Sequence, residues 1–490
     1  MSTAYLYIYR HYVYHRRSLW PLPLSQSPLQ QTRQSLVGAS LHVLERLFQD
    51  HFPAGLLSQS DEGDNSRERV FSRRVTFWTF LWQTLNPASP CRSALLKVKA
   101  WFELMGRPAP SEDTSPYCQA RRRLDSDTLE RALRASALAA DQRAPIHWRF
   151  HGREVLVGDG TTSTAPDTKQ NQRAYPQSAR QRPGCGFPLL RWVALFSLAS
   201  GALRSVALGN KHRAELQLFR QLWDQLKAGM IFLADRGFCD FVTLAGLAQR
   251  GVDSVLRLNH MRPHDFRKGR RLGRYDRLVT WRKPQRKPRT ATRKLWRHLP
   301  ELLTLRLIRY PVQVRGFRSR HIILVTTLLD PRVYPVAKLA QLYLRHWRVE
   351  LFLRDIKTTL QLDILRCKTP AMLYRELMMH LIGYNLIRSL MVEAAALHDL
   401  PLERISFKGS VDALRHYSEV IAQATSRRQQ IQLINNLLTA LARDALPDRP
   451  ERVEPRHLKR RPKDFPFMIR PRAELKAKLL GRKRPEKQGA

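Results

Sequence analysis

A series of short apolar segments between residues 154 and 259 constrains the fold more than any other part of this chain. Three strands are predicted first, one in EVLVGDGTT and two in PLLRWVALFSLASGALRSVAL, on either side of a Ser-Gly turn. Two further strands follow, in MIFLADRGF and at Asp253–Asn259, with helices predicted at Ala214–Leu226 and Phe241–Gln249. The order β-β-β-α-β-α-β predicts an α/β fold in which helices pack on a mixed sheet.

The charge of the chain points to a polyanionic partner. The 85 Lys and Arg residues outnumber the 41 Asp and Glu residues, which gives a formal net charge of +44. A field of this sign and size favours nucleic acid. A membrane is the rival partner, but the longest apolar run, Trp192–Leu203, has twelve residues, fewer than the roughly 20 that a spanning helix needs. We therefore expect a nucleic-acid partner and no membrane partner.

Several common cofactor and metal motifs are missing from the sequence. Walker A and GxGxxG sequences are absent, so we expect no nucleotide cofactor. The five cysteines are scattered and never form a CxxC pair, which argues against a structural zinc site or a disulfide framework and fits a reducing compartment; they are Cys91, Cys118, Cys185, Cys239 and Cys367.

A chain of 490 residues is expected to form several domains. Residues 262–297 contain fifteen Lys or Arg and two acids, and strand-like segments follow them. Trp281 and Trp296 in this block either stack on unpaired bases or belong to the core of a small sheet. We predict the following division: a weakly ordered leader and linker (1–65), a helical domain expected to bind DNA (66–150), the first part of the α/β core (151–260), a basic β-rich insertion (261–334), the second part of the core (335–400), C-terminal helices (401–446) and a basic tail (447–490).

Two acids stand at the ends of apolar strands. Alternation places Asp159 on the same face as Val155 and Val157, and it places Asp235 on the buried face of its own strand. Each acid alone could simply cap a turn. A carboxylate that continues a buried face is costly unless something compensates its charge, and Mg²⁺ or Mn²⁺ would do so.

A third acid lies in the predicted helix YLRHWRVELFLRDIK. Tyr343, Glu350 and Lys357 are seven residues apart, and His346 and Arg354 fall close to the same helix face. The alternative is an amphipathic helix with a solvated charged face. Three carboxylates from two strands and a helix can hold two metal ions roughly 4 Å apart. Such a site supports in-line phosphoryl transfer, with a nucleic-acid phosphodiester as the substrate.

The three motifs together resemble the IS4-type DDE transposases of bacterial insertion sequences. They are DGTT at Asp159, LADRGF at Asp235, and the pattern Y-x2-[R]-x3-E-x6-K from Tyr343 to Lys357. Weaker matches are SPYCQARRRL, LDILRCKTPAM, GYNLIR and PRHLKRRPK. The resemblance covers the chain from about residue 70 to its C-terminus.

The resemblance implies an RNase H-like catalytic core that the β-rich insertion interrupts. It implies that Asp159, Asp235 and Glu350 are catalytic and bind two ions of Mg²⁺ or Mn²⁺. It also implies that the DNA-binding side chains are those of Tyr343, His346, Arg354 and Lys357. His346 departs from the family pattern, because it stands where the family has an arginine, with Arg345 just before it.

The resemblance also implies the biological setting. We expect a DNA transposase that binds the terminal inverted repeats of an insertion sequence, cleaves the strands and transfers them to target DNA. A homodimer in a synaptic complex and a cytoplasmic, nucleoid-associated location are expected. Two alternatives remain open on the residues alone: an RNase H-like nuclease without strand transfer, and a non-catalytic basic DNA-binding protein that is a decayed transposase.

Overall fold

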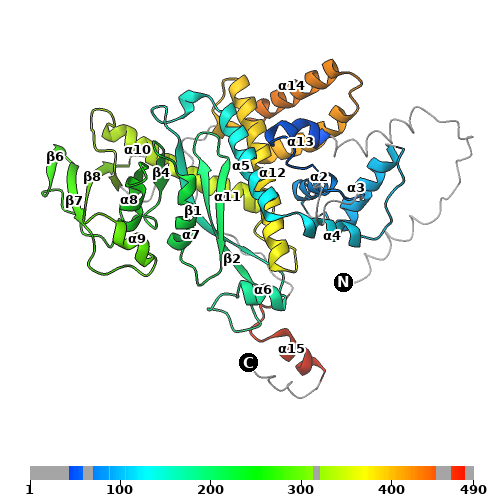
Figure 1. Ribbon diagram of the computed structural model, residues 1–490, viewed down its shortest axis with the longest axis horizontal. Coiled ribbons are helices and arrows are strands. Elements are labelled where there is room, and N and C mark those ends of the chain that lie inside the picture. The colour runs from blue at the N-terminus through cyan, green and yellow to red at the C-terminus, as the bar shows by residue number, and fades with distance from the viewer. Residues whose placement is uncertain are drawn as a thin grey trace, which may run out of the picture.

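A nine-stranded mixed sheet forms the centre of the computed structural model, which describes residues 43–58, 70–87, 89–104, 106–312, 321–447 and 465–480. The strand order is β3-β2-β1-β4-β5-β9-β8-β7-β6, and Figure 1 shows helices on both faces. The strands are β1 (Val155–Thr164), β2 (Leu189–Ser197), β3 (Leu203–Gly209), β4 (Ile231–Ala234), β5 (Asp253–Arg257), β6 (Arg270–Gly273), β7 (Asp276–Arg282), β8 (Leu302–Pro311) and β9 (His321–Thr326).

The expected α/β class with a mixed sheet is confirmed. β1 pairs antiparallel with β2 and parallel with β4, and β4 pairs parallel with β5. The predicted order is present as β1, β2, β3, α7 (Glu215–Gln221), β4, α8 (Phe241–Ala248) and β5. The short helix α6 (Lys169–Ala174) is added in the connection between β1 and β2.

Strand alternation divides the apolar side chains between the two faces of the sheet. Val157 and Leu233 belong to one core cluster, which also includes residues of the helices that follow β9. Leu156 and Phe232 belong to a second cluster with α7 and α8 on the opposite face. The period of two thus buries both faces of β1 and β4, as expected for central strands.

The four strands after β5 lengthen the same sheet and do not form a separate one. β5 pairs with β9, β9 with β8, β8 with β7 and β7 with β6, all antiparallel. The helix α9 (Arg293–His298) interrupts them, and Thr292 caps it by accepting a hydrogen bond from the backbone of Leu295. The expected β-rich character of this basic segment is present, in continuity with the core.

Helices from both ends of the chain pack around the long helix α12 (Pro370–Leu397). Among the helices that contact α12 are α2 (Arg73–Leu85), α4 (Ser115–Arg123), α5 (Ser126–Arg143), α13 (Phe407–Ala422) and α14 (Arg427–Arg443). Other helices lie elsewhere: α3 (Cys91–Leu104) beside α2 and α4, α10 (Val336–Leu344) beside β5 and β8, α11 (Arg348–Arg354) beside β1, and α15 (Arg472–Leu479) near the connection between β1 and β2, where Glu474 pairs with Arg182. α5 lies along α12 and also contacts β3. Short helical turns complete the elements: η1 (Gln49–His51), η3 (Ile146–Trp148), η4 (Trp223–Gln225), η5 (Arg345–Trp347), η6 (Asp355–Thr359) and η7 (Leu402–Arg404).

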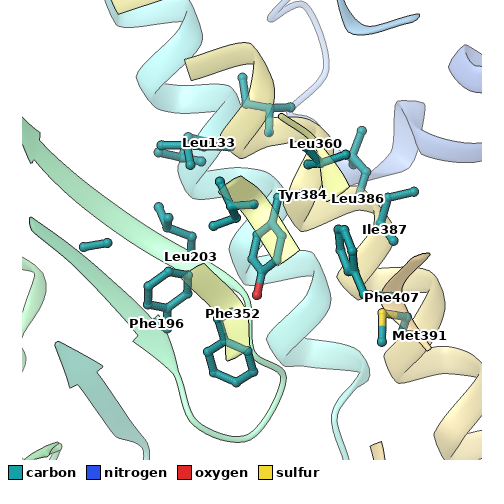
Figure 2. Packing of buried hydrophobic residues seen from close by; sticks show 14 of the residues in the cluster. Leu133, Phe196, Leu203, Phe352, Leu360, Tyr384, Leu386, Ile387, Met391 and Phe407 are labelled. Carbon is teal, nitrogen blue, oxygen red and sulfur yellow. The ribbon is translucent and has the colours of Figure 1, made fainter. Parts of the chain in front are cut away.

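Polar side chains of the GYNLIR segment, which lies within α12, form hydrogen bonds with the β2–β3 hairpin. The hydroxyl of Tyr384 donates to the carbonyl of Gly201 at 2.8 Å. The side chain of Asn385 accepts from the backbone N–H of Leu203 at 2.7 Å and donates to its carbonyl at 3.0 Å. Figure 2 shows Tyr384 with Phe196, Phe352 and Phe407 in the core beside these contacts. The hairpin and the helix therefore hold each other in one orientation.

Part of the predicted division falls outside the described residues. The leader up to residue 42, most of the following linker, the PRHLKRRPK segment and the last ten residues are among the parts not described. Within the part of the chain that is described, none of the helices is both long enough and apolar enough to span a membrane. The domain boundaries themselves remain predictions.

Candidate active site

The strand register brings Asp159 and Asp235 to adjacent positions. β1 and β4 run parallel, and Gly158 of β1 lies opposite Ala234 of β4. The residues that follow these two are Asp159 and Asp235. Neighbouring strands are about 4.8 Å apart. β4 ends at Ala234 while β1 continues to Thr164. The edge of β1 just beyond Asp159 therefore lacks a strand partner on this side and is open to other side chains.

Backbone amides orient both aspartates. The N–H of Gly160 donates to a carboxylate oxygen of Asp159 at 2.7 Å. The N–H of Gly237 donates to Oδ1 of Asp235 at 2.7 Å. Each hydrogen bond occupies one carboxylate oxygen and leaves the other available.

The segment from Tyr343 to Lys357 is helical, but it is not the regular helix that the sequence predicts. A 3-10 turn, η5, follows α10, and a π-helical turn, η6, follows α11. A 3-10 turn is tighter and a π turn is wider than an α-helix. The seven-residue spacing therefore does not keep all the predicted side chains on one face.

Glu350 lies on the exposed side of α11, which packs on β1. Its charge acts on Asp159, together with the charges of Asp235 and Glu215. Burial and these three like charges raise the pKa of Asp159 to about 7, against the lowering effect of the Gly160 hydrogen bond. The charges of three carboxylates thus act on Asp159.

Tyr343 and His346 lie beside Asp235, with their rings stacked at 5.8 Å between centroids. Tyr343 is buried, and desolvation raises the pKa of its phenol above the usual range, so the hydroxyl stays a donor. Burial lowers the pKa of His346, although the Asp235 charge and a hydrogen bond to the Gly158 backbone act in the opposite direction. The imidazole is thus mainly neutral at pH 7, unlike the arginine of the family pattern.

The two predicted cations of this segment point in different directions. Nζ of Lys357 donates to Oγ1 of Thr161 at 3.3 Å, two residues from Asp159. Arg354 pairs with Asp355 at 3.5 Å and lines a cavity together with Leu198. The backbone N–H of Leu198 donates to the carbonyl of Val155, about 13 Å along β1 from Asp159. The structure therefore brings Lys357 to the aspartates and leaves Arg354 outside the group.

Glu215, whose charge also acts on Asp159, is not among the site residues predicted from the sequence. It is the first residue of α7, on the opposite face of the sheet from α11. A Cβ built on Gly160 would lie only 2.8 Å from Cδ of Glu215. Helix-terminal acids are common, and only the glycine in the DGTT motif offered a sequence signal for this close approach.

The donor set suits a hard divalent cation. Among the described residues, no three side chains of His, Cys, Asp or Glu are close enough together to hold a metal ion as they stand. Burial first, and the charges of Asp235, Glu215 and Glu350 after it, raise the pKa of Asp159. Carboxylate oxygens are the ligands that Mg²⁺ and Mn²⁺ prefer, and a cation would relieve this repulsion. The residues therefore fit such an ion.

The two tryptophans of the basic segment are half-buried against the cluster on the α7 and α8 face. The guanidinium of Arg262 lies 3.5 Å from the ring centroid of Trp281, and the ammonium of Lys283 lies 5.2 Å from that of Trp296. Each ring thus packs on the core and has a cation near its face. This arrangement agrees with the core alternative for both residues.

Comparisons with known proteins identify the family. Residues 150–386 match the family model described as "Transposase DDE domain". The transposase InsG of insertion sequence element IS4 from Escherichia coli (strain K12) is 27% identical over 403 residues, which cover 82% of this chain and 88% of InsG. A solved piggyBac transposase synaptic complex with hairpin DNA shares 9% identity, with a TM-score of 0.35 and 86% of each chain covered. The family match spans the strands that carry Asp159 and Asp235 and the helix that carries Glu350, and the chain is a DDE transposase of the IS4 type.

Proposed function

We propose that this transposase cleaves and rejoins DNA at the terminal inverted repeats of its element, with Asp159, Asp235 and Glu350 as the catalytic carboxylates. The observation that carries this proposal is the register of β1 and β4, which sets Asp159 beside Asp235 at an open strand edge. The charge of Glu350 reaches the same point from α11. The order and pairing of β1 to β5 support an RNase H-like core.

The three carboxylates hold two ions of Mg²⁺ or Mn²⁺ in this proposal. When bound, such ions activate the attacking oxygen and stabilise the charge on the phosphoryl group and the leaving oxygen. The protein contributes fixed carboxylates, because backbone amides hold Asp159 and Asp235. In the reaction, a water or 3′-hydroxyl oxygen bonds to phosphorus as the bridging phosphorus–oxygen bond breaks.

Side chains near the carboxylates bind the DNA backbone. Lys357 supplies a positive charge beside Thr161, and Tyr343 supplies a hydroxyl donor. His346 supplies an N–H without a full charge. Arg354 is exposed and lies away from the aspartates, so it contacts a phosphate outside the reacting one.

The wider assembly follows from the same function. The net charge of +44 favours double-stranded DNA, both transposon ends and target. Two subunits hold two ends in a synaptic homodimer, and the protein works in the bacterial cytoplasm on nucleoid DNA. The α2–α4 region, with its three consecutive arginines at the end of α4, supplies a DNA-binding domain.

The decisive experiment compares Asp159→Asn, Asp235→Asn and Glu350→Gln in a cleavage and strand-transfer assay on paired transposon ends. Each change should lower Mg²⁺-dependent cleavage by roughly 10²- to 10³-fold or more. DNA affinity should stay equal or rise slightly, because a negative charge is removed near phosphates. The exposed Asp224 in η4 provides the matched control Asp224→Asn, which should behave like the parent.

The same assay separates the alternatives. Cleavage without joining of the 3′ end to target DNA would indicate a nuclease without strand transfer. A parent protein that binds DNA but neither cuts nor joins it would indicate a decayed transposase. Full cleavage by Asp235→Asn would contradict the assignment of the catalytic carboxylates.

A further inference from the structure

Glu215 places a fourth carboxylate at the open edge of β1. A Cβ built on Gly160 would meet Cδ of Glu215 at 2.8 Å, Oε1 at 3.0 Å and Cγ at 3.1 Å. The carboxylate of Glu215 thus rests on the backbone of the residue that follows Asp159. Any side chain larger than hydrogen at position 160 would displace it.

Glu215 has no cationic side chain paired with it in the described part of the chain, although the chain carries a net charge of +44. The ammonium of Lys211, four residues before Glu215 in the sequence, donates to the carbonyl of Gln177 and does not pair with Glu215. The carboxylate of Glu215 lies against the backbone of Gly160, the residue that follows Asp159. Like charges at such range repel, and a divalent ion is the usual compensator.

A purely structural role explains less of this geometry. An acid in the first turn of a helix interacts favourably with the helix dipole, and Glu215 is in the first turn of α7. The dipole accounts for a negative charge at this position. The dipole does not explain why the side chain of Glu215 contacts Gly160, nor why it lies at the edge of β1 beside Asp159.

The fold lets carboxylates from both faces of the sheet reach one point. Asp159 shares the α11 face with Val157, and Gly160 faces the α7 side. β4 stops at Ala234, and the next pairing of β1 among the described residues on an edge other than that of β2 is the bridge from Thr164 to Ile364. Between these two points no described strand separates the two sides. A cation at this edge can therefore be approached from above by Glu350 and from below by Glu215.

We propose that Glu215 is a fourth carboxylate of the divalent-cation site and acts as a positioning residue for the cation that Asp159 and Asp235 hold. This inference rests on the proposed function. Glu215 adds negative charge and a hydrogen-bond acceptor on the α7 side of the ion. Loss of a partner of this kind lowers metal affinity by about 10- to 100-fold.

The test measures Mn²⁺ binding to the full-length protein without DNA, by electron paramagnetic resonance of the free ion. Glu215→Gln, which keeps the shape and removes the charge, should weaken Mn²⁺ binding by about 10-fold. Glu215→Asp keeps the charge but withdraws it by one methylene, and it should give an intermediate value. Asp224→Asn removes the same charge from an exposed site in the adjacent turn and should match the parent.

The activity readout separates positioning from catalysis. For Glu215→Gln, the metal concentration at half-maximal cleavage should rise in parallel with the Mn²⁺ dissociation constant, while the rate at saturating metal stays close to that of the parent. If the Glu215→Gln protein binds Mn²⁺ like the parent while the Asp235→Asn protein has lost Mn²⁺ binding, the proposed role of Glu215 is overturned and the metal site is not. Unchanged binding by Asp235→Asn overturns the proposed metal site itself.

Discussion

At the scale of the residue, one acid in the basic segment has a structural task. Asp276 is one of two acids among residues 262–297, and it is almost completely buried. It accepts two hydrogen bonds from the fully buried Arg306, Nε to Oδ1 at 2.9 Å and Nη2 to Oδ2 at 2.7 Å. Arg306 also donates to the carbonyl of Tyr334 at 2.7 Å. The pair thus ties β7 and β8 to the chain that enters α10.

Asp276→Asn should destabilise the protein by about 3 to 5 kcal/mol, because it leaves the buried Arg306 guanidinium without a counter-charge. The free energy of unfolding can be followed by urea denaturation with tryptophan fluorescence. Asp265→Asn is the matched control, since it removes the other acid of the segment, whose partner Arg267 is 91% exposed. It should leave the unfolding midpoint unchanged. Equal effects of the two changes would show that Arg306 does not depend on Asp276.

At the scale of the element, α12 determines where the β2–β3 hairpin lies. Arg388 donates to the carbonyl of Ser200 through Nε at 2.9 Å and Nη2 at 2.7 Å. Asn385, one turn earlier, bonds both backbone groups of Leu203 and also the hydroxyl of Ser136 in α5 at 3.2 Å. Buried backbone groups need such partners. The GYNLIR segment therefore acts through packing of the core, and the sheet that it orients carries Asp159 in the neighbouring strand.

Asn385→Ala should lower the free energy of unfolding by about 2 to 4 kcal/mol, because the N–H and carbonyl of Leu203 lose their side-chain partner in the core. Urea denaturation measures this loss. Asn435→Ala, at an exposed position of α14, should be neutral or slightly stabilising, since alanine favours a helix more than asparagine does. A loss as large as that of Asn385→Ala at this control site would contradict the specific role of Asn385.

At the scale of the whole molecule, two buried histidines make the packed helices sensitive to acid. Burial, and secondly the Arg143 charge, lowers the pKa of His51 to about 3, and its Nε2 lies 2.8 Å from the hydroxyl of Ser389 in α12. Burial and the Arg366 charge lower the pKa of His380, also in α12, to about 3. Both imidazoles are neutral in the folded protein at pH 5, whereas the unfolded chain protonates them below about pH 6.5.

Stability should therefore fall as the pH falls from about 6.5 towards 3, because the unfolded state binds more protons over this window. The two histidines together should cost about 3 to 4 kcal/mol between pH 7 and pH 5. Asp159 acts in the opposite direction, since its raised pKa lets the folded state bind a proton first. The free energy of unfolding is therefore measured by urea denaturation at pH 7 and at pH 5, for the parent and for the double variant His51→Gln, His380→Leu. The loss between the two pH values should be smaller in the double variant. An equal loss in both proteins would rule out these histidines as the cause.

Local sequence patterns were sufficient to predict the strands β1 to β5. The alternation of apolar residues predicted β1 to β5 and placed Asp159 and Asp235 at the ends of apolar runs, because period two is a local property of an extended chain. The family motifs added Glu350. The irregular turns η5 and η6 were not predictable from periodicity. Arg354 ends α11, whereas Lys357 lies in the wider π-helical turn η6.

By itself, the sequence determined the α/β class and the transposase family, since each depends on neighbouring residues or on a recognisable spacing. Only the tertiary structure decided that β6 to β9 extend the core sheet and that Glu215 rests on Gly160. Both depend on contacts between segments far apart in the sequence, in which register and side-chain packing set the distances. An acid at the start of a short helix is ordinary until the sheet places it against the residue that follows Asp159.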